Sequence, residues 1–164
     1  MTRHIMVLVL AGTLAGAGTA GAANRACGLL TAAELESAVG GKVSGLSQGG
    51  AGVAGVEMCS ASTPAASILL RIAKSSGRPS GEAERAGLEI ARKMGAEVEV
   101  RTFGPVTCST IVPPQSMTDQ GFNTTCSVVK AGQVAAIEVN AKSRKDQVPI
   151  EKLRPLAEKI AGRI

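Results

Sequence analysis

Four cysteines are the sequence feature that most constrains how this chain can fold: Cys27, Cys59, Cys108 and Cys126. An even number of cysteines in an exported chain indicates disulfide bonds. Three pairings are possible, and we favour Cys27–Cys59 with Cys108–Cys126 because neighbours along the chain close the shorter loops. Each bond would stabilise the fold by about 2–4 kcal/mol through the unfolded state. A metal site would need thiolates at close spacing, usually Cys-x2-Cys and often with histidine. Residues 23–164 contain neither a Cys-x2-Cys motif nor a histidine.

The first 22 residues have the layout of a secretory signal peptide. Arg3 and His4 provide a short positive start, an apolar run covers positions 5–14, and Ala20-Gly21-Ala22 reads as a cleavage site. The rival interpretation, a membrane anchor, needs about 20 strongly apolar residues. Lipid anchoring at Cys27 is not expected, because no box of leucine and small residues precedes it. We therefore predict a secreted or periplasmic protein with no transmembrane segment after cleavage near Ala22.

The remaining positions, 23–164, fit a single domain, because chains divide only well beyond about 200 residues. Alternating or continuous apolar residues bounded by turn residues predict strands. The predicted strands cover 42–47, 56–60, 67–74, 97–103, 124–130 and 133–141, and the last two form a hairpin. The segment 104–123 is expected to be irregular. Helices separated by runs of strands indicate an α+β domain, with an antiparallel sheet of about six or seven strands packed against two or three helices.

Two of the predicted helices are amphipathic. The second follows Ser80, a plausible N-cap, and its apolar face is formed by Ala83, Ala86, Ile90, Ala91 and Met94. The C-terminal helix has an apolar stripe formed by Ile150, Leu153, Ala157, Ile160, Ala161 and Ile164. Pro155 costs about 3 kcal/mol in a helix interior. We therefore expect the regular part of the C-terminal helix to start close to Pro155.

The opening residues predict the first helix and carry a family resemblance. Thr31 with Glu34 forms a capping box, and Gly40-Gly41 ends the helix. The run Cys27-Gly28-Leu29-Leu30-Thr31-Ala32-Ala33-Glu34-Leu35 resembles bacterial secreted and lipoprotein families of unknown function. These begin with Cys-x-Leu-Leu-Thr-x-x-Glu and carry a second cysteine on the following strand, where Cys59 fits. The resemblance implies a PsbP/Mog1-like α/β/α sandwich and an envelope location, and it implies no activity.

Few motifs in the sequence point to catalysis. The only histidine, His4, lies in the predicted signal peptide, so Ser–His and Cys–His nucleophile systems are not expected. The glycines at 50–55 match G-x-G-x-x-G, but a strand follows them where a dinucleotide site needs a helix. Ser127 and Lys130 match S-x-x-K, yet residues three apart on a strand face opposite sides. Glu97 and Glu99 share one strand face, which we interpret as solvated. No catalytic residue, metal or cofactor is predicted.

The segment between Cys108 and Cys126 is the first candidate binding region. Long loops in compact domains are often functional, and a disulfide would reduce the ordering cost on binding. The alternative is a stapled surface loop whose two phenylalanines, Phe103 and Phe122, enter the core. The candidate partner-binding residues are Ile111, Val112, Pro113, Pro114, Met117 and Phe122.

The basic C-terminal stretch is the second candidate binding region. Positions 142–164 hold seven basic and three acidic residues. The excess positive charge could bind anionic envelope lipids, cell-wall polymers or an acidic partner. The alternative is the solvated face of an amphipathic helix. Nucleic acid is not expected, because secretion and the absence of basic–aromatic interleaving both argue against it.

These features lead to one expected function and two alternatives. We expect an exported, non-catalytic binding or accessory protein of the cell envelope, which would contact an envelope protein or an anionic envelope component. The first alternative is an inhibitor of a secreted or periplasmic enzyme, since such inhibitors also use rigid stapled loops. The second is a hydrolase that uses carboxylates or a Ser/Lys pair.

Overall fold

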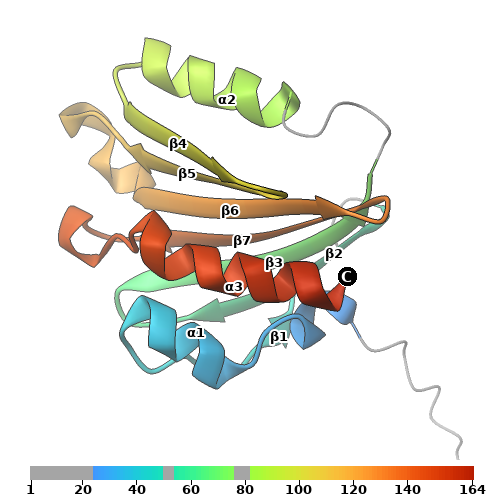
Figure 1. The fold of residues 1–164 in the computed structure, drawn as a ribbon. Coiled ribbons are helices and arrows are strands. Elements are labelled where there is room, and N and C mark those ends of the chain that lie inside the picture. The colour runs from blue at the N-terminus through green and yellow to red at the C-terminus, as the bar shows by residue number, and fades with distance from the viewer. Residues whose placement is uncertain (1–23, 50–53, 76–81) are drawn as a thin grey trace, which may run out of the picture.

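The computed structural model describes residues 24–49, 54–75 and 82–164. The predicted signal peptide, Ser80 and most of the glycine-rich loop therefore lie outside the described residues. Within the described part, the chain forms one seven-stranded antiparallel sheet with three α-helices, and the α+β prediction is confirmed (Figure 1).

The strands are ordered β1-β2-β3-β7-β6-β5-β4 across the sheet. Their bounds in that order are Ser47–Gln48, Val56–Ser62, Ala66–Lys74, Gln133–Ala141, Phe122–Lys130, Val106–Val112 and Glu97–Phe103. The predicted hairpin is confirmed as β6 and β7. Its turn residues Ala131 and Gly132 have φ angles of 50° and 73°, and positive φ at both central positions matches the twist of the flanking strands.

Two strand predictions were wrong. The strand predicted over 42–47 is reduced to β1, because the Ser44 hydroxyl bonds with Ser62 and competes with a regular ladder. The segment 104–123 was expected to be irregular, yet β5 occupies Val106–Val112. The polar residues of β5 interrupt the apolar pattern that predicts a strand. In the folded chain β5 pairs with β4 on one side and with β6 on the other.

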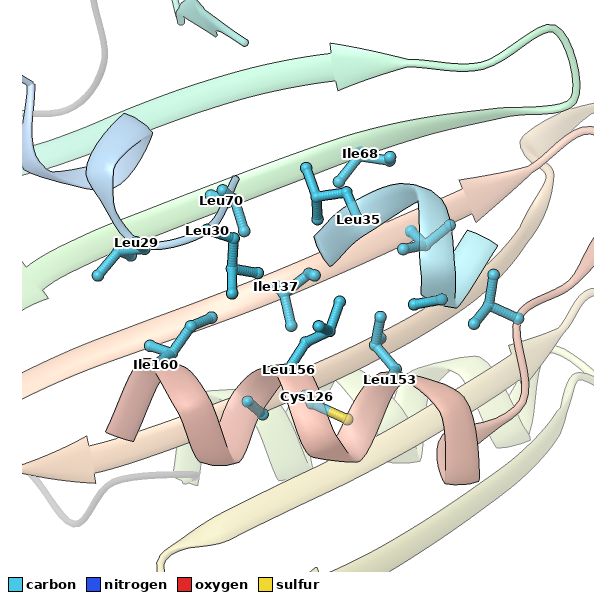
Figure 2. Packing of buried hydrophobic residues seen from close by; sticks show 14 of the residues in the cluster. Leu29, Leu30, Leu35, Ile68, Leu70, Cys126, Ile137, Leu153, Leu156 and Ile160 are labelled. Atoms are coloured by element: carbon cyan, nitrogen blue, oxygen red, sulfur yellow. The ribbon is translucent and has the colours of Figure 1, made fainter. Parts of the chain in front are cut away.

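One face of the sheet, called the inner face, is covered by α1 (Ala32–Val39) and α3 (Ile150–Arg163) (Figure 1). A row of directly paired side chains crosses five strands on this face, and each member has no exposed surface: Cys59, Leu70, Ile137, Cys126 and Cys108. Figure 2 shows side chains from both helices meeting this row, including those of Leu35 and Leu156.

Both predicted disulfides are confirmed, and they fix the two ends of that row. Cys59 is bonded to Cys27 in η1 (Arg25–Gly28), which precedes α1. Cys108 is bonded to Cys126 directly across the β5–β6 pair, with 4.0 Å between their Cα atoms. The bonds therefore hold the N-terminal turn and β5 to the same core.

Helix α3 buries its predicted stripe, but it begins at Ile150, five residues before Pro155. The expectation that the helix would start close to Pro155 was wrong. Proline lacks the N–H that would bond to the Glu151 carbonyl. Both residues are exposed, so water can satisfy that carbonyl and the helix continues through the proline.

Helix α2 (Glu82–Lys93) leaves Ala86 and Ile90 of its predicted apolar face exposed to solvent. Ile90 is 58% exposed, whereas Leu88 is 6% exposed. The Glu84 carboxylate accepts a hydrogen bond of 3.3 Å from the hydroxyl of Ser127, whose side chain lies opposite to the inner-face residue Cys126. The first turn of α2 therefore lies over the other face of the sheet, called the outer face.

Candidate interaction surface at one end of the sheet

Residues 112–121, called the end segment, join β5 to β6 at one end of the sheet. The segment contains Pro113, Pro114 and η2, a 3-10 helix over Gln115–Gln120. The short helix η3 (Arg144–Asp146) lies at the same end, ahead of α3 (Figure 1). This end therefore gathers loops from two distant parts of the sequence.

The end segment is fixed at its base from two directions. The disulfide Cys108–Cys126 joins the strands that lead into and out of the segment. The Gln147 side-chain amide, which follows η3, donates to the carbonyls of Ile111 at 3.3 Å and Asn123 at 2.9 Å. The two ends of the segment are thus fixed in the folded chain, and fixed ends reduce the ordering cost of binding.

The candidate partner-binding residues are divided between surface and core. Val112 lies on the inner face and Ile111 on the outer face, and both are half-buried, as is Met117 in η2. Pro113 and Pro114 between them are also half-buried. Phe122 is only 7% exposed and belongs to the hydrophobic core, so it is not available at the surface.

A groove of about 430 Å³, called the inner groove, opens on the inner face beside the end segment. Its wall combines the start of β4, the end of β5 and the approach to α3. The charged and polar lining includes Glu97, Glu99, Arg144, Gln147 and Glu151, with Val112 as an apolar member. Glu97 and Glu99 were predicted to share a strand face, but Arg144, Gln147 and Glu151 were not predicted to join them, because these three come from a distant segment of the chain.

The acidic groups of the inner groove are paired with arginines. Arg144 Nη2 lies 2.8 Å from a Glu97 carboxylate oxygen, and Arg101 pairs with both Glu99 and Glu151. The pKa of Glu151 is lowered by its own backbone N–H and then by Arg101. A general acid at neutral pH needs a raised carboxyl pKa, whereas the contacts of Glu151 favour its ionised form.

A second groove of about 460 Å³, the outer groove, opens on the opposite side of the end segment. Its lining is mixed, and the polar members include Ser67, Asp119, Asn140 and Lys142. Gly121 has φ +81°, and a Cβ there would lie 2.0 Å from Asn140 Oδ1. Glycine at this position therefore lets the end segment approach β7, where Asn140 donates to the Gln120 carbonyl at 3.2 Å.

The structure separates the S-x-x-K pair as the strand pattern predicted. Ser127 points to the outer face and bonds with Glu84. Lys130 extends along the inner face, and its ammonium donates to the Ala161 carbonyl of α3 at 2.6 Å. In the glycine-rich motif at 50–55, positions 50–53 lie outside the described residues, and β2 follows at Val56.

Most basic side chains of the C-terminal stretch are already engaged. Arg144 pairs with Glu97 and Arg154 with Glu158, while Lys159 and Arg163 both pair with Glu34 of α1. Arg163, followed by the backbone N–H of Thr31, lowers the pKa of Glu34 to about 2. The two pairs with Glu34 join α1 to the end of α3. All four pairs reduce the positive charge that is free to bind an anionic surface.

Within residues 24–49, 54–75 and 82–164, no helix is long and apolar enough to cross a membrane. The same residues bring no three histidine, cysteine or acidic side chains together in a way that could hold a metal ion. Comparison of the chain with protein-family models, curated proteins and solved structures found no match.

Proposed function

We propose that this chain is an exported binding or accessory protein of the cell envelope, and that it contacts a protein partner through the end segment. The observation that carries the proposal is the fixation of this segment by Cys108–Cys126 and by the two hydrogen bonds of Gln147. Two grooves flank the segment, so a partner could contact its apolar side chains and the polar walls together. The two disulfides also suit an oxidising, extracytoplasmic compartment.

The pairing of charges supports a protein partner over an anionic polymer or lipid. The inner groove contains acidic groups neutralised by arginines, and the basic residues near the end of α3 are paired with Glu34. Half-buried Val112, Pro113 and Met117 offer apolar contact between the grooves. A mixed apolar and polar surface of this kind is typical of protein interfaces.

Site-specific photo-crosslinking in the native envelope tests the proposal. A photoreactive residue at Met117 should capture one partner protein, whereas the same residue at Gly162 should not. Gly162 is a suitable control because it is exposed and a Cβ there would meet no other part of the fold within 4 Å. It also lies near the C-terminus, at the other end of the sheet (Figure 1).

Binding by the purified partner then separates recognition from folding. Met117→Ala should weaken binding at least about tenfold, as expected for a residue at the centre of an interface, with an unchanged melting temperature, because Met117 is not part of the hydrophobic core. An equal loss of binding and thermal stability would show that the segment is structural and would overturn the proposal, as would identical adducts at Met117 and Gly162. If the captured partner is a hydrolase, its inhibition would identify the inhibitor alternative.

A further inference from the structure

The two edges of the sheet differ in length and in exposure. Strand β1 has two residues, whereas β4 presents seven, Glu97–Phe103, and pairs only with β5 among the described strands. A long edge strand offers unpaired N–H and C=O groups to another strand. The exposed large hydrophobic side chains of the described residues are Ile90 in α2, Met94 directly after α2 and Val100 in β4, and α2 contacts β4.

The register of the sheet identifies the backbone groups that point outward from β4. Cys108 and Cys126 are directly opposite with Cα atoms 4.0 Å apart, the short spacing of a non-hydrogen-bonded pair. The N–H and C=O of Cys108 therefore point toward Arg101 of β4, its partner on the other side. The backbone groups of Arg101 point inward to β5, so those of its neighbour Val100 point to the open edge.

The charges of β4 are arranged symmetrically about Val100. Glu99 and Arg101 lie one residue to either side of it and share the inner face, while Val98, Val100 and Thr102 share the outer face. An antiparallel copy centred on Val100 would place Glu99 opposite Arg101 twice, at the closely spaced non-hydrogen-bonded positions. We propose that two copies of this chain pair through their β4 strands about a two-fold axis at Val100.

Neighbouring registers are disfavoured by the same charges. An axis at Glu99 would place the two copies of Glu99 opposite each other, and an axis at Arg101 would do the same with two guanidinium groups. Like charges directly opposite on paired strands are destabilising. In the single chain Arg101 holds Glu99 and Glu151, and its five N–H donors allow it to keep Glu151 while bonding to Glu99 of the second copy.

Sedimentation velocity of the secreted, oxidised protein across micromolar concentrations tests this pairing, which does not rest on the proposed function. The wild-type protein should form a dimer. Glu99→Arg and Arg101→Glu, which each place like charges opposite one another, should separately weaken it at least about tenfold. An equimolar mixture of the two variants should associate, because both cross-strand positions then oppose unlike charges.

Val100→Pro provides a second test on the backbone. Proline removes an N–H that points to the open edge, so it should abolish the dimer without breaking a bond to β5. Val100→Thr is the matched control, since it keeps that N–H. A wild-type protein that stays monomeric, or a folded Val100→Pro protein that still forms the dimer, would overturn the proposal. If Val100→Pro fails to fold, the mixture of charge variants decides, because variants that remain separate when mixed would also overturn it.

Discussion

Helices α2 and α3 have similar amphipathic sequences, yet only α3 buries its stripe. Leu153 and Ile160 of α3 have no exposed surface, because they pack on the apolar inner face around Ile137 (Figure 2). Ile90 of α2 is 58% exposed, and the outer face near its first turn is formed by polar residues such as Ser127. A helical pattern identifies the face that can be buried, and the sheet opposite decides whether it is.

The largest expected effect comes from the helix that buries its stripe. Leu153→Ala should lower the free energy of unfolding by about 2–5 kcal/mol, because it leaves a cavity among well-packed side chains. Urea denaturation of the wild-type and variant proteins measures this loss. A change below about 1 kcal/mol would mean that α3 contributes little packing and would remove the contrast with α2.

The disulfides should each contribute about 3 kcal/mol through the unfolded chain, slightly more for Cys27–Cys59 because it spans 32 residues against 18 for Cys108–Cys126. Paired Cys→Ala variants, compared by urea denaturation, measure both. Loss of Cys108–Cys126 should also speed amide exchange in β4 and β5, since this bond ties them to the core. Equal exchange in both variants would contradict that local role.

The ion pairs between α1 and α3 give a pH-dependent effect. The pKa of Glu34 falls from 4.5 to about 2 in the folded protein, so its contribution is present above pH 4.5 and is lost as the pH falls toward 2. Glu34→Gln, which keeps a capping-box side chain, should cost about 1–2 kcal/mol at pH 7. Thermal unfolding across this pH range should show the two proteins converging in acid, and a constant difference would contradict the assignment.

The smallest effects are expected at Ile90 of α2 and at Met94, which directly follows α2. Ile90→Ala and Met94→Ala should each change the free energy of unfolding by less than about 0.5 kcal/mol, because both side chains are already exposed. Urea denaturation beside Leu153→Ala provides the comparison. A loss of about 2 kcal/mol or more would show that α2 packs its apolar stripe against the protein in solution.

Local signals predicted part of this fold correctly. Thr31 and Glu34 form the expected capping box, with the Glu34 N–H donating to Thr31 Oγ1 at 3.3 Å. The β6–β7 hairpin depends on residues that are close in sequence, and the disulfide pairing was preferred among three because it joins cysteines that are neighbours along the chain, 32 and 18 residues apart. The capping box and the hairpin could be predicted because their partners lie near each other along the chain.

The features that the sequence did not predict depend on distant partners. Strand β5 exists because β4 and β6 supply its hydrogen bonds, although Thr107 and Ser109 weaken its apolar pattern. The inner groove brings Glu97 to Arg144, 47 residues apart. The region between Cys108 and Cys126, which contains the end segment, was recognised from these two cysteines, but the hydrogen bonds from Gln147 at its base could only be seen in the folded chain.

Amide hydrogen exchange of the native protein, resolved to single residues, tests the contrast between the two helices most directly. The account predicts that the central amides of α3 exchange only on global unfolding, whereas those of α2 exchange much faster through local opening. Slow exchange in α2 that matches α3, with the same sensitivity to urea, would contradict it, because both helices would then belong to one cooperative core.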